Sequence, residues 1–344
     1  MCLTNSSRGV AVAAIFLLSA GCSVTPCDDK AKSYSRGLEG PYLGQTPPGV
    51  EPLLFAEGVV STGMSELNSV FSPDGTEFYF SIAAGSMHWV VMVTYLRDGV
   101  WTKPEAVDFT GPYSAVDMAF SPDGNRLYYC SNRPISGAGK AGETVDIWYV
   151  ERTADGWSEP INPGPPINTE HHEFYPSLTT DGTLYFQSRR PGGPGPGDIY
   201  RSRLVDGEYR EAELLPAPIN TEDSEGDALI AQDESFIIIT GRAPEPPGTR
   251  NFDLFVSFQR EDGSWTERIS LGERVNSDQG ENCPVLSPDE RFFFYTSRRA
   301  DGVPGERESY DELHQRWNQP AFGHSHGDIY WVDAGLIEAL RPRN

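Results

Sequence analysis

The sequence predicts an all-β protein, a five-bladed β-propeller built from four-stranded antiparallel blades. A segment related to SPDG recurs at intervals of about 50 to 58 residues, which is close to the length of a propeller blade. An apolar stretch precedes each copy and an aromatic run follows it. Gly and Pro are abundant, at 35 and 28 residues, as is typical of many short strands joined by turns.

The repeated turn predicts a hairpin between the first two strands of each blade. In SPDG the proline presets φ and Asp-Gly accommodates a tight reversal. The five turn aspartates are Asp74, Asp123, Asp181, Asp233 and Asp289. The runs after them, EFYFS, RLYYCS, TLYFQS, SFIIIT and RFFFYTS, are the expected second strands.

A third strand is expected after a loop of variable length in each repeat. The expected third strands are WVVMVTYL (89–96), VDIWYVER (145–152), GDIYRSRL (197–204), FDLFVSFQ (252–259) and GDIYWVDA (327–334). The first four are followed by an Asp-Gly turn that leads into a fourth strand, at Asp98, Asp155, Asp206 and Asp262. Four short strands in a meander form one propeller blade.

The last repeat has only three strands, followed by AGLIEALRP (334–342), which we expect to form a short C-terminal helix. Residues 51–75 align with 159–182, which lead into the third repeat. We therefore expect the N-terminal segment to supply the missing outer strand of the last blade, next to Asp328–Val332. Such closure protects the open edge of the sheet. The propeller domain is then 47–344.

The N-terminus has the features of a secretory signal, with Arg8 before a short apolar run and small residues after it. LLSAGCS resembles the bacterial lipobox. That resemblance implies a signal peptide over 1–21, a lipid-bearing Cys22, and outer-membrane sorting because Ser23 follows. Residues 22–46 would be a tether. The alternative is an ordinary cleaved signal in which Cys22 is accidental.

The net charge of −23 makes nucleic acid an unlikely partner, because such a surface repels phosphate backbones. Contact with a membrane is expected only through the lipid anchor, and the expected state is a monomer. No zinc-type cysteine spacing occurs. Cys130 and Cys283 fall in expected strands of different repeats and are interpreted as small buried hydrophobic residues, not as a disulfide.

The motif SPDG-x-x-L/F-Y-F-x-S-x-R with a later G-D-I-Y resembles the WD40-like propeller repeat of bacterial envelope proteins of the TolB type. The resemblance covers about 51 to 334 and implies the propeller fold and an envelope location, periplasmic or surface-facing. It does not assign a function, since such blades occur in scaffolds, in peptidoglycan-associated proteins and beside peptidase domains. The first repeat departs from the motif, lacking the Arg after strand two and the Asp opening strand three.

Polar residues recur on the loops of one propeller face, the face that usually binds ligands. Acidic residues before the first strands form a candidate ligand-binding ring together with two arginines. The members are Glu66, Asp117, Glu173, Glu225, Glu281, Arg190 and Arg299. Converging carboxylates could bind a cation or a basic peptide, or could pair with the two arginines.

An Arg at the end of strand two and an Asp at the start of strand three recur in four repeats, and we interpret them as a structural staple. The expected pairs are Arg133–Asp146, Arg189–Asp198, Arg242–Asp253 and Arg298–Asp328. Histidines cluster in loops of the same face. If a divalent metal binds, the expected ligands are His171, Glu173, His324 and His326. Otherwise no cofactor is expected.

Two functions remain open from the sequence. The first is a non-catalytic envelope lipoprotein whose propeller face binds a protein, a peptide or a peptidoglycan or other glycan ligand. The second is a glycan-active hydrolase or lyase that uses two channel carboxylates, with or without a metal. No nucleophile motif such as G-x-S-x-G is present, and no catalytic residue is assigned.

Overall fold

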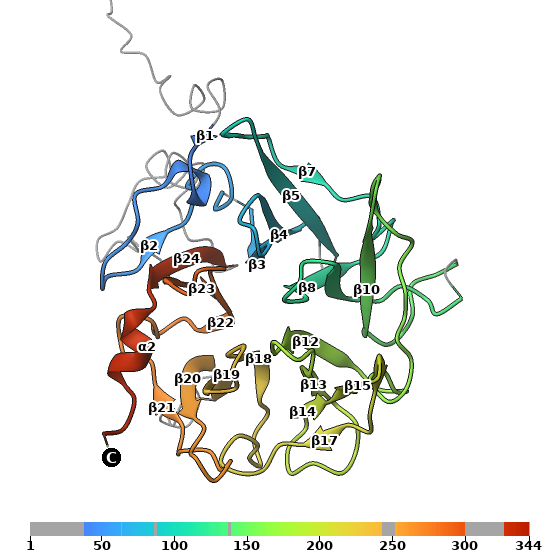
Figure 1. Cartoon of the computed structure of the whole chain (residues 1–344), viewed down its shortest axis with the longest axis vertical. Coiled ribbons are helices and arrows are strands. Elements are labelled where there is room, and N and C mark those ends of the chain that lie inside the picture. The colour runs from blue at the N-terminus through green and yellow to red at the C-terminus, as the bar shows by residue number, and fades with distance from the viewer. Residues whose placement is uncertain are drawn as a thin grey trace, which may run out of the picture.

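The computed structural model describes residues 38–62, 64–85, 88–136, 139–242, 252–299 and 327–343. Five antiparallel sheets stand around a central axis, as the sequence predicts (Figure 1). Within each blade the three inner strands follow one another outward from the axis, and in blades 1 and 5 the outermost strand comes from the N-terminal segment.

The three inner strands of every blade form a regular meander. In blade order, they are β3 (Glu66–Phe71), β4 (Glu77–Ala83) and β5 (Trp89–Arg97); β8 (Ala115–Phe120), β9 (Arg126–Ser131) and β10 (Asp146–Thr153); β12 (Glu173–Leu178), β13 (Leu184–Ser188) and β14 (Asp198–Ser202); β18 (Gly226–Ile230), β19 (Phe236–Arg242) and β20 (Phe252–Phe258); and β22 (Glu281–Leu286), β23 (Phe292–Ser297) and β24 (Asp328–Asp333). All neighbouring pairs are antiparallel.

The outer part of each blade is shorter than the sequence suggests. After an Asp-Gly turn the chain first pairs back on the end of strand three, in β6 (Val100–Trp101), β11 (Gly156–Trp157) and the hairpin β15 (Leu204–Val205) with β16 (Glu208–Tyr209). It then makes a second short pairing, in β7 (Glu105–Ala106), β17 (Glu213–Leu214) and β21 (Ile269–Ser270) and at Ile161 opposite Tyr149. The outer strand of these blades therefore consists of two short paired segments separated by a bend.

The N-terminal segment closes the ring, as predicted. Strand β2 (Leu53–Leu54) pairs with β24 opposite Trp331 and Tyr330. The Phe55 N–H then donates to Ile329 O at 2.8 Å. Strand β1 (Leu38–Glu39) adds to β6 at the outer corner of blade 1, and helix α2 (Gly335–Ala339) follows β24. The last blade therefore contains strands from both ends of the chain.

Hydrophobic contact between neighbouring blades forms the core. There are five buried clusters, one at each seam; the cluster between blades 5 and 1 contains Phe55, Phe71, Phe78, Phe294 and Trp331. The second strand of every blade is covered on both faces by the neighbouring blades. In β13 and β23 all residues are buried. This explains why the second strands read as continuous aromatic and aliphatic runs instead of alternating with polar residues. Among the described residues, no helix is long and apolar enough to span a membrane.

Candidate functional site

A recurring segment joins one blade to the next at four of the five junctions, and the sequence analysis missed it. It reads INTEHHE (167–173), INTEDSE (219–225), VNSDQGE (275–281) and VSTGMSE (60–66). In three copies the Asn side chain clasps the third strand of the preceding blade. Asn220 accepts from Ile199 N at 2.7 Å and donates to Ile199 O at 2.9 Å, and Asn168 and Asn276 do the same to Ile147 and Leu254. The fixed spacing before each Glu was the available signal.

The glutamates of the predicted ring end these segments and are fully buried, at 0 to 1% exposure. Each accepts a hydrogen bond from the hydroxyl four residues earlier, at 2.5 to 2.7 Å: Thr62 to Glu66, Thr169 to Glu173, Thr221 to Glu225 and Ser277 to Glu281. The carboxyl groups therefore hold their own loops in place at the seams.

Arginines complete this arrangement in three blades. Arg190 lies 3.5 Å from Glu173, Arg268 lies 3.1 Å from Glu225, and Arg299 lies 3.8 Å from Glu281. Ser188 and Ser297 add hydroxyl hydrogen bonds to Glu173 and Glu281. The predicted pairing of the ring glutamates with Arg190 and Arg299 is thus present as internal contacts.

Glu66 differs from the other three glutamates. It faces Ile82 across the ladder, where Glu173 and Glu281 face serines, and Ala84 follows two residues later, where blades 3 and 5 have Arg190 and Arg299. No described residue gives a hydrogen bond of good geometry to its Oε2 atom. Burial raises the pKa of Glu66 to about 9, the negative charge of Asp328 adds to the rise, and Thr62 opposes it through hydrogen bonds.

The arginines and aspartates of the predicted staple have varied surroundings. The Arg133 guanidinium lies over the Tyr113 and Trp148 rings, Arg189 lies over Phe174, and Arg242 lies 3.8 Å from Asp223. Arg298 lies close enough to Asp227 to lower its pKa.

The four aspartates share one register position, opposite Ser131, Ser188, Gly241 and Ser297. Asp146 accepts from Asn162 at 3.1 Å, and Asp198 accepts from Gly195 N at 3.2 Å. Asp328 faces Glu66 across a seam. Direct contact within the four Arg–Asp pairs stays a prediction.

The candidate metal ligands are only partly placed. His171 lies 3.9 Å from Glu170, and Glu173 is engaged as described above. His324 and His326 lie outside the described residues. Within the part of the chain that the structure describes, no group of three or more His, Cys, Asp or Glu residues could hold a metal ion.

One residue per blade turns toward the axis from a bulge in the first strand. The five positions are Asn68, Asp117, Tyr175, Asp227 and Cys283, all with φ between 40° and 58°, and we call them the girdle. Positive φ is uncommon for residues other than glycine, so its recurrence in every blade marks a built feature. The girdle links blades, because Asn68 accepts from Met118 N at 2.8 Å and Asp227 accepts from Cys283 N at 3.1 Å.

Two carboxyl groups of the girdle, Asp117 and Asp227, influence each other. Burial raises the pKa of Asp117 to about 8, and the charge of Asp227 adds to the rise, while the Tyr175 N–H and the Cys130 thiol oppose it. Burial also raises the pKa of Asp227, against hydrogen bonds from Cys283. Cys130 and Cys283 are buried and free, as expected, and burial raises the pKa of both thiols. The girdle therefore carries one proton more at neutral pH than two ordinary aspartates would.

The side chain of Tyr175, itself a girdle residue, lies between the other four girdle residues and the opposite end of the channel. Its hydroxyl donates to Pro284 O at 2.9 Å, so the side chain reaches from blade 3 to blade 5. These two blades are not neighbours in the ring, and the phenol ring therefore crosses the channel. The buried ring forms a floor below the girdle.

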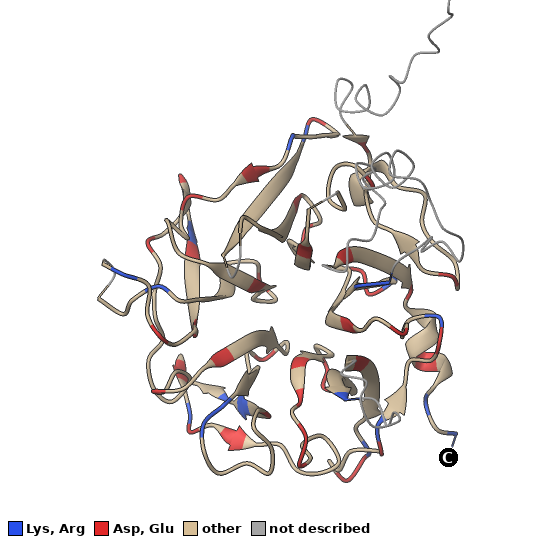
Figure 2. Ribbon diagram, turned by 180° about the vertical axis from the view of Figure 1, so that it is seen from behind, with Lys and Arg blue, Asp and Glu red and all other residues tan. Residues whose placement is uncertain are grey.

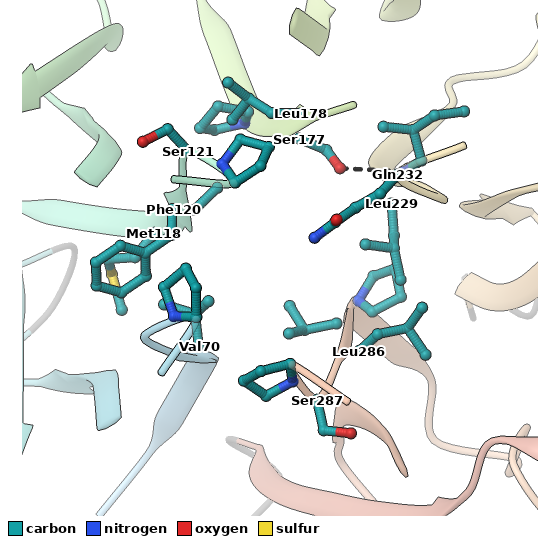
Figure 3. A pocket seen from close by; sticks show the side chains of 18 of the residues that line it. Val70, Met118, Phe120, Ser121, Ser177, Leu178, Leu229, Gln232, Leu286 and Ser287 are labelled. Carbon is teal, nitrogen blue, oxygen red and sulfur yellow. Dashed lines mark hydrogen bonds between the residues drawn. The ribbon is translucent and has the colours of Figure 1, made fainter. Parts of the chain in front are cut away.

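Beyond this floor the channel widens into an apolar funnel that opens on the face of the SPDG turns. Its volume is about 130 Å³. Figure 3 shows side chains from all five blades around an open centre, among them Val70, Phe120, Leu178, Leu229 and Leu286. An apolar cavity of about 150 Å³ takes up a benzene ring, so the funnel has room for one apolar side chain.

Negative charge surrounds the funnel. Glu290 lines it, and the five turn aspartates directly follow lining or neighbouring turn residues. Each has a pKa below its ordinary value. In Asp123 and Asp181 the hydroxyls of Ser121 and Thr179 are the main cause, whereas in Asp74, Asp233 and Asp289 the hydrogen bonds of the turn outweigh partial burial. Figure 2 shows acidic positions on every blade around the ring. The turn aspartates are therefore ionised at neutral pH, and each also has an arginine close enough to lower its pKa.

No family model and no curated protein matches the chain. Similar solved structures include a putative TolB from Agrobacterium tumefaciens, with 20% identity and a TM-score of 0.45, over 72% of this chain and 74% of that one. TolB from Acinetobacter baumannii is 15% identical with a TM-score of 0.43, over 69% of this chain and 49% of that one. The catalytic domain of the GH62 α-L-arabinofuranosidase from Coprinopsis cinerea is 9% identical with a TM-score of 0.45, over 83% and 97%.

Proposed function

We propose that this protein is a non-catalytic envelope lipoprotein that binds a partner protein, with the apolar funnel on the SPDG-turn face as its binding site. The funnel carries the proposal, because it is a concave apolar site to which all five blades contribute. The predicted ring on the opposite face has three of its four glutamates neutralised internally. Of the ring glutamates, Glu66 is therefore the one that stays a candidate ligand-binding residue.

Shape and charge together define the expected partner. A funnel of about 130 Å³ fits one leucine-sized or aromatic side chain and is too small for a sugar chain. The anionic turn aspartates and Glu290 favour basic residues on either side of that anchor. The partner is therefore an exposed peptide segment with an apolar residue between lysines or arginines. Such an anchor in a pocket, with charges at the rim, is a common way of achieving specific recognition.

Fluorescence polarisation with three labelled peptides tests this proposal. The peptides carry Leu between lysines, Ser between lysines, or Leu between glutamates. We expect the first to bind at least tenfold more tightly than the other two. Ala119→Trp should fill the funnel and weaken binding at least tenfold. Equal binding of the three peptides, or unchanged binding by an Ala119→Trp variant with wild-type thermal stability, would overturn the proposal.

A glycan-active enzyme is the second candidate, and Asp117 and Asp227 favour it. Two carboxyl groups whose environments shift their pKa values are the ingredients of acid–base catalysis. Both accept backbone hydrogen bonds from a neighbouring blade, however, which gives them a structural role. Polysaccharide turnover that disappears in both Asp117→Asn and Asp227→Asn would favour the enzyme over the binding protein.

A further inference from the structure

Blade 1 contains the carboxyl half of an ion pair that recurs in blades 3 and 5, and no described residue supplies the cation there. In blades 3 and 5 the arginine two residues after the facing serine fills this position. The Arg190 guanidinium contacts Ser188 Oγ, Pro166 O, Ile167 O and Glu173, and Arg299 contacts Ser297 Oγ, Arg274 O, Val275 O and Glu281. The repeat of all four kinds of contact defines a slot that fits a guanidinium group.

The chain around Glu66 preserves the acceptor side of this slot. Val59 and Val60 precede Glu66 by seven and six residues, as Pro166 and Ile167 precede Glu173. Thr62 bonds Glu66 as Thr169 bonds Glu173. The donors are missing, because Ile82 replaces the serine and Ala84 replaces the arginine.

We propose that the Glu66 slot of blade 1 binds the guanidinium group of an arginine side chain supplied by another molecule. Among the described residues, the Thr62 hydroxyl donates to Glu66 Oε1, and no serine or arginine side chain joins it there. Glu173 Oε1 and Glu281 Oε1 each face both a serine hydroxyl and an arginine. Ala84, at the position of Arg190, is exposed, and Met64, two residues before Glu66, is 48% exposed. A planar group with several donors matches a carboxylate beside backbone carbonyls better than an ammonium does.

The carboxyl pair at this seam also predicts how the site responds to pH. Among the described residues, Asp328 is the ionisable group that raises the pKa of Glu66, through its charge and a side-chain hydrogen bond, and Thr62 opposes the rise. Burial raises the pKa of Glu66 to about 9, so at neutral pH a proton occupies the place that a cation would take. A bound guanidinium must displace that proton. We therefore expect affinity to rise with pH, by up to tenfold per unit, until about pH 9.

Isothermal titration of the full chain with the peptides Gly-Arg-Gly, Gly-Lys-Gly and Gly-citrulline-Gly tests the proposal. We expect the arginine peptide to bind at least tenfold more tightly than the lysine peptide, and the neutral citrulline peptide not to bind. Glu66→Gln should abolish binding. The matched change Glu281→Gln, in a slot already filled by Arg299, should leave binding unchanged.

A variant that fills the slot separates this site from a purely structural carboxyl. The double substitution Ile82→Ser with Ala84→Arg reproduces Ser188 and Arg190 in blade 1. We expect it to raise the melting temperature and to abolish binding of Gly-Arg-Gly. Equal binding of the arginine and citrulline peptides, or wild-type binding by the folded double variant, would refute the proposal. The site lies at the opposite end of β3 from the funnel, so its failure would not affect the proposed function.

Discussion

At the scale of single residues, the girdle shows what one buried proton does to stability. Asp117 occupies the position that Asn68 has in blade 1, and both side chains accept a backbone N–H from the next blade. The amide of Asn68 does this without charge. The carboxyl of Asp117 must either keep its proton or carry a buried negative charge, which destabilises the folded state. Burial raises the pKa of Asp117 to about 8, above the value of about 4 in an unfolded chain.

The sign of the pH dependence follows from that difference. The folded state binds the proton more tightly, so its stabilising contribution is complete below about pH 4, declines as the pH rises and is lost above about pH 8. Asp117→Asn keeps the acceptor and removes the titration. We expect the variant to match the wild type near pH 4 and to be more stable by about 1 to 3 kcal/mol at pH 8. Urea denaturation at both pH values measures this, and a variant less stable than wild type at pH 8 would contradict it.

At the scale of elements, the sequence predicts the frame better than the details of the site. The SPDG turns, aromatic second strands and third strands were located correctly because turn chemistry and double-sided burial are local properties. The closing strand was found because 51–75 aligns with a later repeat. The outer strand was misjudged in form, since the Asp-Gly turn first produces a short hairpin with strand three.

The girdle and the funnel could not have been located in this way. Their residues converge only when five blades close around an axis, and the bulges that aim Asn68 or Tyr175 leave no sign in strand periodicity. The sequence shows the spacing of the ring glutamates, but not their burial, which depends on contacts between neighbouring blades. The clasp asparagines were visible as a repeated motif, and their role became clear only from the third strand they contact.

The asparagines that bond the third strand of the preceding blade, Asn168, Asn220 and Asn276, offer a direct test of how neighbouring blades are held together. Asn220 makes three buried side-chain hydrogen bonds, to Ile199 N, Ile199 O and Leu215 O. At the closing seam Ser61 replaces the asparagine and contacts only Ile329. Removing a buried polar partner costs about 1 to 3 kcal/mol per group left unsatisfied.

We therefore expect Asn220→Ala to lower the free energy of unfolding by about 2 to 4 kcal/mol and Ser61→Ala by about 1 kcal/mol. Urea denaturation followed by tryptophan fluorescence compares the two. Asn125→Ala serves as a control, at an exposed asparagine whose side chain bonds Asp123 in its own turn, and it should change the free energy of unfolding little. A smaller loss for Asn220→Ala than for Ser61→Ala would show that the closing seam, and not the clasp, limits stability.

At the scale of the whole molecule, two binding features lie at opposite ends of one channel that Tyr175 closes. The Glu66 slot belongs to the loop face, and the funnel belongs to the SPDG-turn face. The turn aspartates near the funnel are ionised at neutral pH, whereas Glu66 must lose its proton before it can pair with a cation. Under both proposals the partner is basic, and at physiological salt such attraction acts only at short range, because the screening length is about 8 Å. A protein held at a surface benefits, since its partners are already concentrated nearby.

Cys22, at the start of the expected tether, is the predicted site of lipid attachment. Lipidation there would anchor the propeller, because each buried methylene of an acyl chain contributes about 0.8 kcal/mol to membrane binding. We expect Cys22→Ser to move the protein from the membrane fraction to the soluble fraction, measured by immunoblotting after fractionation of cells that express the full chain. Cys27→Ser, five residues along in the expected tether, is the matched control and should remain with the membrane. Both variants should bind the arginine and leucine peptides as the wild type does, because the propeller begins beyond them. If Cys22→Ser also stays with the membrane, its attachment depends on something other than an acyl chain at this residue.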